Sequence, residues 1–349
     1  MKIPTSIQNT KHAVRSVLIT VCCILFIFIL IEAGLRLLVK NNVIPKPGIG
    51  SIHPELNVKL LKLDQFVKQN GGVDCIFLGS SMIDDSVNPS IFTKEYRKLS
   101  GRNVHCFNLS IASLTAETAY PIVKMLNVRY NPLLIVYGIS PRDLTSDFDV
   151  RIRPLIHEPW INYQNGEFSI SGWLKENSYT YRYYVTVLSY LNPDNRASLQ
   201  IYQTSVNEDG FNLVDRNTIG IGGQNYIKKW KTNLDDMHGL KKMLLMGKGD
   251  SFRIILAEAP VHDLFLPIYV EGSKEKYFSL FQKPIEELTK QYNTIFIKSV
   301  SGAPSFIPNK FWGDVKHLNY KGADVFSRWL ANQIWQQIDS GTIEDPFRP

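Results

Sequence analysis

Short apolar segments alternate with amphipathic helical patterns along most of the chain, and this order constrains the fold more than any other feature of the sequence. Segments that are apolar at nearly every position are typical of strands buried on both faces of a parallel sheet. Five such segments occur, at residues 74–80, 104–110, 133–140, 252–260 and 294–300. The sequence therefore predicts an α/β fold, namely a flavodoxin-like three-layer sandwich around a five-stranded parallel sheet.

One large insertion interrupts the alternation after the third strand, at residues 141–248, and it is rich in Tyr, Asn, Asp and Gly. We expect it to form a cap or lid near the carboxyl ends of the strands, where ligands bind in such sheets. Its clearest helical pattern, residues 179–191, is rich in tyrosine. Most of these rings are expected in the core of the cap, although tyrosines also stack on sugar rings and lie at bilayer interfaces.

The amino-terminal region contains an apolar segment long enough to cross a membrane. Residues 17–31 carry no charge, and continuation to Val39 gives 23 residues, or roughly 35 Å of helix at 1.5 Å per residue, which matches a bilayer core. Glu32 and Arg36 lie four residues apart near its end and can pair there. Three basic residues precede the segment and predict a cytoplasmic amino terminus; they are Lys2, Lys11 and Arg15.

These segments define the expected organisation of the chain. It comprises a cytoplasmic tail (1–16), a transmembrane helix (17–39), a linker and lead-in helix (40–69), an α/β domain that contains the insertion (70–340) and a terminal tail (341–349). Because no small-x-small cleavage site follows the apolar segment, an uncleaved anchor is favoured over a signal peptide. For a bacterial source, we expect a single-pass protein of the inner membrane whose α/β domain lies in the periplasm or outside the cell.

The charge and the cysteines exclude some classes of function. The net charge of +7 is modest for 349 residues, and the basic residues are spread along the chain. This distribution argues against nucleic-acid binding and is compatible with attraction to anionic lipid or acidic polysaccharide. The four cysteines lack zinc-type spacing, and Cys75 and Cys106 fall in predicted strands, where a free thiol behaves as a small hydrophobic group. The sequence predicts neither a metal site nor a cofactor.

Polar residues follow the predicted strands at the edge where a ligand would bind. Ser80 ends the first strand segment and Ser81 follows it, and Asp314 and His317 lie three residues apart before the last helix. A serine hydroxyl becomes a nucleophile when an imidazole takes its proton and a carboxylate orients that imidazole. The alternative is that the serines and Asp314 only cap helices.

In their order along the chain, these motifs resemble those of the SGNH/GDSL hydrolase superfamily. The similarity covers most of residues 70–338 apart from the insertion. It consists of Gly-x-Ser after the first strand, Asn-Leu-x-x-x-small after the second, Gly at the end of the third and Asp-x-x-His before the last helix. The resemblance implies the SGNH hydrolase fold, with Ser81 as the nucleophile and with Asp314 and His317 as its partners.

Three positions depart from the family pattern. Ser80 replaces the aspartate of Gly-Asp-Ser. The second-block glycine, which donates its backbone N–H to the oxyanion, corresponds to Ser113, with Ser110 as the other candidate. The third-block asparagine is missing, and Ser140 lies nearest to its position. Loss of one oxyanion donor can cost about 2.7–4 kcal/mol of transition-state stabilisation, so the expected activity is low or restricted to activated acyl donors.

Other polar residues have two interpretations each. Asn108 and Arg142 complete the expected oxyanion and substrate-binding residues, although Arg142 can equally form an ordinary loop ion pair with Asp143. His262, after the fourth strand, is either a substrate contact or a surface loop histidine.

The expected function is that of a membrane-anchored serine esterase or O-acyltransferase. Its substrate would be an acyl group, acetyl foremost, on a cell-surface glycan or related polymer. Resemblance to the alginate O-acetyltransferase group and to the D-alanine transfer proteins of teichoic acid assembly implies this chemistry and an envelope acyl-transfer partner protein. The missing asparagine motivates the alternative, a non-catalytic protein of this fold that binds an acylated glycan or an envelope assembly partner. Lipase action is a third interpretation.

Overall fold

Five parallel strands form one sheet, which confirms the predicted α/β class. The computed structural model describes residues 5–51, 53–144, 152–213, 237–249, 252–266, 273–299 and 306–347. The strands are β1 (Cys75–Gly79), β2 (Cys106–Asn108), β3 (Leu134–Ile139), β4 (Arg253–Glu258) and β5 (Phe296–Ile297). Their order in the sheet is β2-β1-β3-β4-β5, and every neighbouring pair is parallel. This is the strand order of flavodoxin-like sheets.

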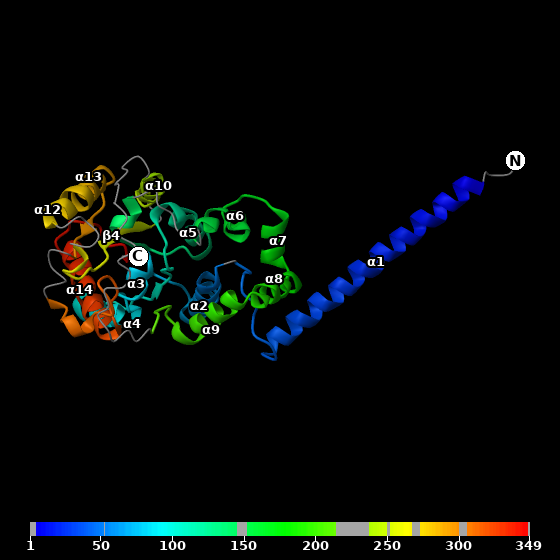
Figure 1. The fold of residues 1–349 in the computed structure, drawn as a ribbon, viewed down its shortest axis with the longest axis horizontal. Coiled ribbons are helices and arrows are strands. Elements are labelled where there is room, and N and C mark those ends of the chain that lie inside the picture. Colours follow the sequence, from blue (N-terminus) through cyan, green and yellow to red (C-terminus); the bar gives the residue numbers. More distant parts are fainter. Residues whose placement is uncertain are drawn as a thin grey trace.

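Helices cover both faces of the sheet (Figure 1). On one face, α4 (Pro89–Ser100) packs against the last helix, α14 (Tyr320–Asp339). On the other, α5 (Ala116–Tyr130) packs against α10 (His238–Met246). The connection from β4 to β5 contains α12 (Lys274–Tyr277), η5 (Phe278–Gln282) and α13 (Lys283–Gln291). Because all strands run in the same direction, their carboxyl ends meet at one edge.

Two glycines allow a short helix to lie directly on that edge. β1 ends at Gly79, which pairs with Gly138 of β3. The helix α3 (Ser81–Asp84) follows at once and places Ile83 over both glycines. A Cβ atom added to Gly138 would lie 1.9 Å from Ile83 Cγ1, and one added to Gly79 would lie 2.8 Å from the same atom. The absence of side chains at these strand ends therefore sets the position of α3.

The described helices of the insertion lie along one flank of the sandwich, between it and the amino-terminal helix (Figure 1). They are α6 (Pro159–Gln164), α7 (Ile170–Asn177), α8 (Tyr179–Leu191) and α9 (Pro193–Ser205), preceded by η1 (Pro141–Leu144) and η2 (Arg153–His157). α6 packs against α5, and α9 packs against α2 (Pro54–Asn70). α10 lies within the expected boundaries 141–248 but belongs to the helical layer of the sandwich.

The expectation that most tyrosines of residues 179–191 form a cap core is wrong. The helix itself is found at the predicted residues, as α8. Its tyrosines are half-buried or exposed, and its fully buried side chain is that of Arg182. Helical periodicity alone does not say what covers a helix, and the described part of the chain leaves one face of α8 exposed.

The amino-terminal helix α1 (Thr5–Lys40) extends away from the rest of the molecule (Figure 1). Within the described residues, it is the one helix that is long and apolar enough to cross a membrane, over Ala13–Lys40. A signal sequence would meet the same criterion. The part of the following linker at residues 47–51 is buried rather than free, because Asn57 of α2 bonds both the backbone N–H and the carbonyl of Ser51, at 2.9 and 2.7 Å.

Candidate active site

Ser80 and Ser81 have different roles in the structure: Ser80 caps a helix, and Ser81 contacts His317. Ser80 is the N-cap of α3, and its hydroxyl accepts a long hydrogen bond of 3.4 Å from the Met82 N–H. Ser81 is the first residue of the helix. Its hydroxyl points elsewhere, to the imidazole of His317, 236 residues further along the chain.

Ser81, His317 and Asp314 form a continuous chain of hydrogen bonds. The Ser81 Oγ lies 2.9 Å from His317 Nε2, and His317 Nδ1 lies 2.7 Å from Asp314 Oδ2. An ionised carboxylate only accepts hydrogen bonds, so His317 carries its proton on Nδ1. Nε2 is then left as the acceptor for the Ser81 hydroxyl. The structure thus brings together all three residues that the sequence predicted as catalytic.

Asp314 holds both the imidazole and the loop that carries it. While Oδ2 bonds the imidazole, Oδ1 accepts the backbone N–H groups of Lys316 at 2.8 Å and His317 at 2.9 Å. Burial acts to raise the pKa of Asp314, but the hydrogen bond and charge attraction of His317, together with the backbone N–H and charge of Lys316, outweigh it, and the net pKa is lowered. The carboxylate therefore stays ionised at neutral pH, as an orienting partner for His317 requires.

His262 helps to fix the same loop from the neighbouring strand end. Its backbone N–H donates to the Val315 carbonyl at 2.8 Å, and its Nε2 lies 3.2 Å from Asn309 Oδ1. Its ring packs edge-on against Trp312, with centroids 5.4 Å apart. These contacts favour the interpretation of His262 as a loop histidine over that of a substrate contact.

The expectation for the Asn108 side chain is corrected by its hydrogen bonds. Its amide nitrogen donates to the carbonyls of Val87 at 2.8 Å and Ile83 at 3.3 Å, which uses both amide hydrogens. Its oxygen accepts the Ser110 N–H at 2.9 Å. Asn108 therefore shapes the loop after β2 and ties it to α3, rather than donating to a substrate. The same bond removes Ser110 as a backbone oxyanion donor.

Ser113 adopts the backbone conformation that glycine prefers. Its φ is +66°, and the other non-glycine residues with positive φ in the described chain are all asparagines. Left-handed backbone costs an ordinary L-residue roughly 1–2 kcal/mol, whereas glycine enters it without this penalty. Of the two serines considered for a backbone donor, Ser113 rather than Ser110 therefore has the glycine-like conformation.

The end of β3 is organised by a buried carboxylate, and this corrects the expectation for Ser140. Asp143 accepts hydrogen bonds from the Tyr137 hydroxyl at 2.5 Å, the Ala116 N–H at 2.7 Å and the Ser140 N–H at 2.8 Å. It also accepts the single hydroxyl hydrogen of Ser140, at 3.1 Å, so that hydrogen is not directed at an oxyanion. Burial of Asp143 raises its pKa despite these donors. Arg142 lies half-buried beside it in η1.

A buried charge cluster beneath the site was not predicted from the sequence. Lys59 of α2 bonds Asp84 of α3 and, at 2.6 Å, the carbonyl of Ser110. Glu55, one turn earlier, accepts the Ala112 N–H at 2.7 Å. The cluster links α3 to the loop after β2, so it sets the spacing between Ser81 and that loop. The available signal was a Glu/Lys pair four residues apart within an otherwise apolar face of residues 55–63.

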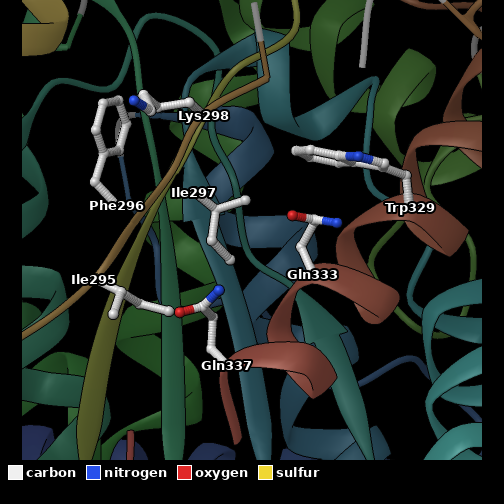
Figure 2. Close-up of a pocket in the computed structure, with 7 residues that line it drawn as sticks. All are labelled: Ile295, Phe296, Ile297, Lys298, Trp329, Gln333 and Gln337. Carbon is white, nitrogen blue, oxygen red and sulfur yellow. The ribbon is translucent and has the colours of Figure 1, made fainter. Parts of the chain in front are cut away.

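A surface depression between β5 and α14 is separate from this site (Figure 2). It is lined by residues of two segments, namely Ile295, Phe296, Ile297, Lys298, Trp329, Gln333 and Gln337. Among the residues that the structure describes, no group of three or more His, Cys, Asp or Glu side chains is arranged to hold a metal ion.

Comparisons with known proteins add nothing to the site geometry, so the functional proposal below rests on that geometry and on the sequence. Neither the protein-family models nor the curated proteins searched contain a match to this chain.

Proposed function

We propose that this protein is a serine esterase or O-acyltransferase of the SGNH/GDSL type. The single observation that carries the proposal is the hydrogen-bonded chain from Ser81 through His317 to Asp314. A capping role does not require it, because Ser80 already caps α3. The 2.9 Å and 2.7 Å spacings match those needed for nucleophile activation by a general base.

In the proposed mechanism, the Ser81 oxygen attacks the acyl carbon of an ester while His317 Nε2 takes the hydroxyl proton. Asp314 stabilises the imidazolium that forms. Collapse of the tetrahedral intermediate breaks the bond to the alcohol oxygen, which receives the proton from His317, and leaves the acyl group on Ser81. Attack by water completes hydrolysis, whereas attack by an acceptor hydroxyl completes transfer. In each case His317 accepts the proton of the attacking water or hydroxyl and gives it to the Ser81 oxygen as the bond between that oxygen and the acyl carbon breaks.

The oxyanion that develops during this attack needs donors near Ser81. We propose the backbone N–H of Ser113 as one of them, because its φ of +66° matches the glycine of the family motif. The Ser140 hydroxyl is bonded to Asp143, so the third donor of the family is not supplied by this side chain. Removal of one oxyanion donor lowers kcat by about 10²–10³-fold, so turnover is expected to be slow.

The proposed location follows from α1. With this helix as a membrane span, the α/β domain lies beside the bilayer, in the periplasm or outside a bacterial cell. The substrate class we propose is an acylated cell-surface glycan or related polymer, with an envelope acyl-transfer protein as the partner.

The bond from Ser140 to Asp143 also favours a second candidate, a non-catalytic protein that binds an acylated glycan or an envelope assembly partner. In that case Ser81 would form the observed hydrogen bond but would not react. The two candidates differ in whether a covalent Ser81 adduct forms.

Labelling with a fluorophosphonate probe distinguishes the candidates. Wild type is expected to label, and Ser81→Ala is expected to lose labelling completely. Ser80→Ala is the matched control, because it removes the adjacent hydroxyl without touching His317, and it should retain labelling. Equal labelling of wild type and Ser81→Ala, or none in wild type, would rule out the enzymatic proposal.

A further inference from the structure

We propose that the exposed face of α8 lies in the bilayer interface and gives the protein a second membrane contact beside α1. This inference rests on the proposed role of α1 as a membrane span. It does not depend on the chemistry of Ser81.

α8 presents a continuous apolar stripe that no described part of the chain covers. Its residues are spaced at i, i+3, i+4 and i+7, which places them on one face of the helix. They are Tyr184, Val187, Leu188 and Leu191, with exposed fractions of 58%, 56%, 47% and 73%. Exposed apolar stripes on an otherwise packed helix mark interaction surfaces. The adjacent α7 adds Trp173, which is 45% exposed.

The start of α8 is fixed to the end of α1 by a polar contact. The Glu32 carboxylate accepts the backbone N–H groups of Tyr179 and Thr180, both at 2.9 Å, and the Ser178 hydroxyl at 3.0 Å. Arg36 pairs with Glu32 at 2.8 Å and stacks over the Tyr179 ring at 4.7 Å. A residue of α1 thus occupies the amino end of α8, where a carboxylate is favoured.

The position of Glu32 along α1 sets the level of α8 relative to a bilayer. The uncharged segment 17–31 spans about 22 Å at 1.5 Å per residue, which is shorter than a hydrocarbon core of about 30 Å. The lipid boundary therefore falls at or beyond Glu32, and α8 begins at that level. The backbone groups and hydroxyls of α8 satisfy the carboxylate, as a polar group at this depth requires.

Lipid is the occupant that these observations favour. The apolar surface of α1 over Ala13–Lys40 is unburied in the molecule, and α8 adjoins its end (Figure 1). A bilayer that covers α1 therefore meets the neighbouring stripe without any further partner. Tyr184 and Trp173 are the aromatic types that are enriched at membrane interfaces. Two contacts at one level would prevent the α/β domain from turning freely about α1.

The test places an environment-sensitive NBD dye on the full chain in vesicles of phosphatidylcholine and phosphatidylglycerol that contain doxyl-labelled lipid. The dye is attached to Leu188→Cys in a Cys22→Ala/Cys23→Ala background, because the other two cysteines are buried. Leu245→Cys in the same background is the control, since Leu245 is 62% exposed on α10. A third sample carries the dye on native Cys22 of α1, with Cys23→Ala.

The inference predicts a blue-shifted emission and loss of intensity by lipid quenching for Leu188→Cys and Cys22, and neither for Leu245→Cys. Quenching at Cys22 with a Leu188→Cys signal equal to that of Leu245→Cys would overturn the second contact while leaving the anchor in place. A blue shift at Leu188→Cys without lipid quenching would show that protein covers the stripe, which also overturns it. Lack of quenching at Cys22 would refute the anchor itself. None of these outcomes bears on probe labelling of Ser81.

Discussion

The two carboxylate oxygens of Asp314 bond different groups, and both groups lie in the same short loop, so this loop alone fixes the orientation of His317. Oδ1 fixes the backbone of the loop, and Oδ2 fixes the imidazole. The Asp-x-x-His spacing alone also fits a helix cap, so Asp314 and His317 were predicted from the order of the motifs along the chain and from the resemblance to the SGNH/GDSL hydrolase superfamily. The choice of Ser81 over Ser80 was likewise implied by that resemblance, whereas a glycine and two serines at the end of an apolar segment predict only that a hydroxyl lies at the sheet edge.

The residues whose roles the sequence misassigned have hydrogen bonds that their position at a strand end does not reveal. Asn108 is the last residue of β2 and Ser140 comes directly after β3, as a substrate-binding residue would. The Asn108 amide is nevertheless bonded to the Ile83 and Val87 carbonyls, and the Ser140 hydroxyl is bonded to Asp143. Strand-end position predicts that a polar group is near the site but not which of its hydrogens are already in use.

Ser113 provides a prediction at the scale of one residue. We expect Ser113→Gly to be more stable to unfolding than Ser113→Ala by roughly 0.5–1 kcal/mol, because relief of the left-handed strain exceeds the added flexibility of the unfolded chain. Both variants keep the backbone N–H and should keep probe labelling. Denaturant titration of the purified protein measures the difference. A more stable alanine variant would show that this position carries no strain.

At the scale of elements, α3 connects the sheet to the chemistry. Ile83 packs over two strand ends that lack side chains, and Asp84 joins the buried cluster with Lys59. The packing of Ile83 on the two glycines and the ion pair between Asp84 and Lys59 therefore fix the position of α3 and of its first residue, Ser81. The two glycines were recognised in the sequence, but the packing of Ile83 against them was not.

Enlarging one of these glycines tests the placement of α3. We expect Gly138→Ala to lower stability by about 1–3 kcal/mol, as overpacking does, and to reduce probe labelling, because the new methyl group displaces Ile83. Adding Ile83→Ala removes the two closest atoms, Cγ1 and Cδ1, and leaves the Cβ at 3.0 Å, so the double variant should lose less stability than the sum of the two single changes. Gly72→Ala, with open space around its Cβ, is the control and should change neither quantity. Strictly additive losses would mean that Gly138 does not position α3.

Strands and helices differed in how well the sequence predicted them. Each apolar segment contains a strand, although the fifth yields only Phe296–Ile297. α8 begins and ends as expected, yet its environment was misjudged, because an amphipathic pattern also fits a helix whose apolar face meets lipid. The environment of the apolar face of α8 depends on where α1 lies, and the sequence of α8 alone does not specify that position.

At the scale of the whole molecule, the parallel sheet explains why Ser81 and His317 meet. β1 lies second in the strand order and β5 lies at the far edge. α14 packs against α4, the helix that follows β1 and α3. The loop before α14, which carries His317, therefore lies near the carboxyl end of β1, where Ser81 follows. This juxtaposition was predictable from the alternation of apolar segments, while the insertion and the anchor affect where the site faces rather than how it is built.

The central claim is that Ser81 and His317 act as one catalytic unit, and the rate of p-nitrophenyl acetate hydrolysis by four proteins tests it most directly. These are wild type, Ser81→Ala, His317→Ala and the double variant. Residues that act as a unit are not additive. Each single change should therefore lower kcat/KM by about 10⁴-fold or down to background, and the double variant should lose no more than either one. Losses that multiply in the double variant, or single variants that retain the wild-type rate, would contradict the account.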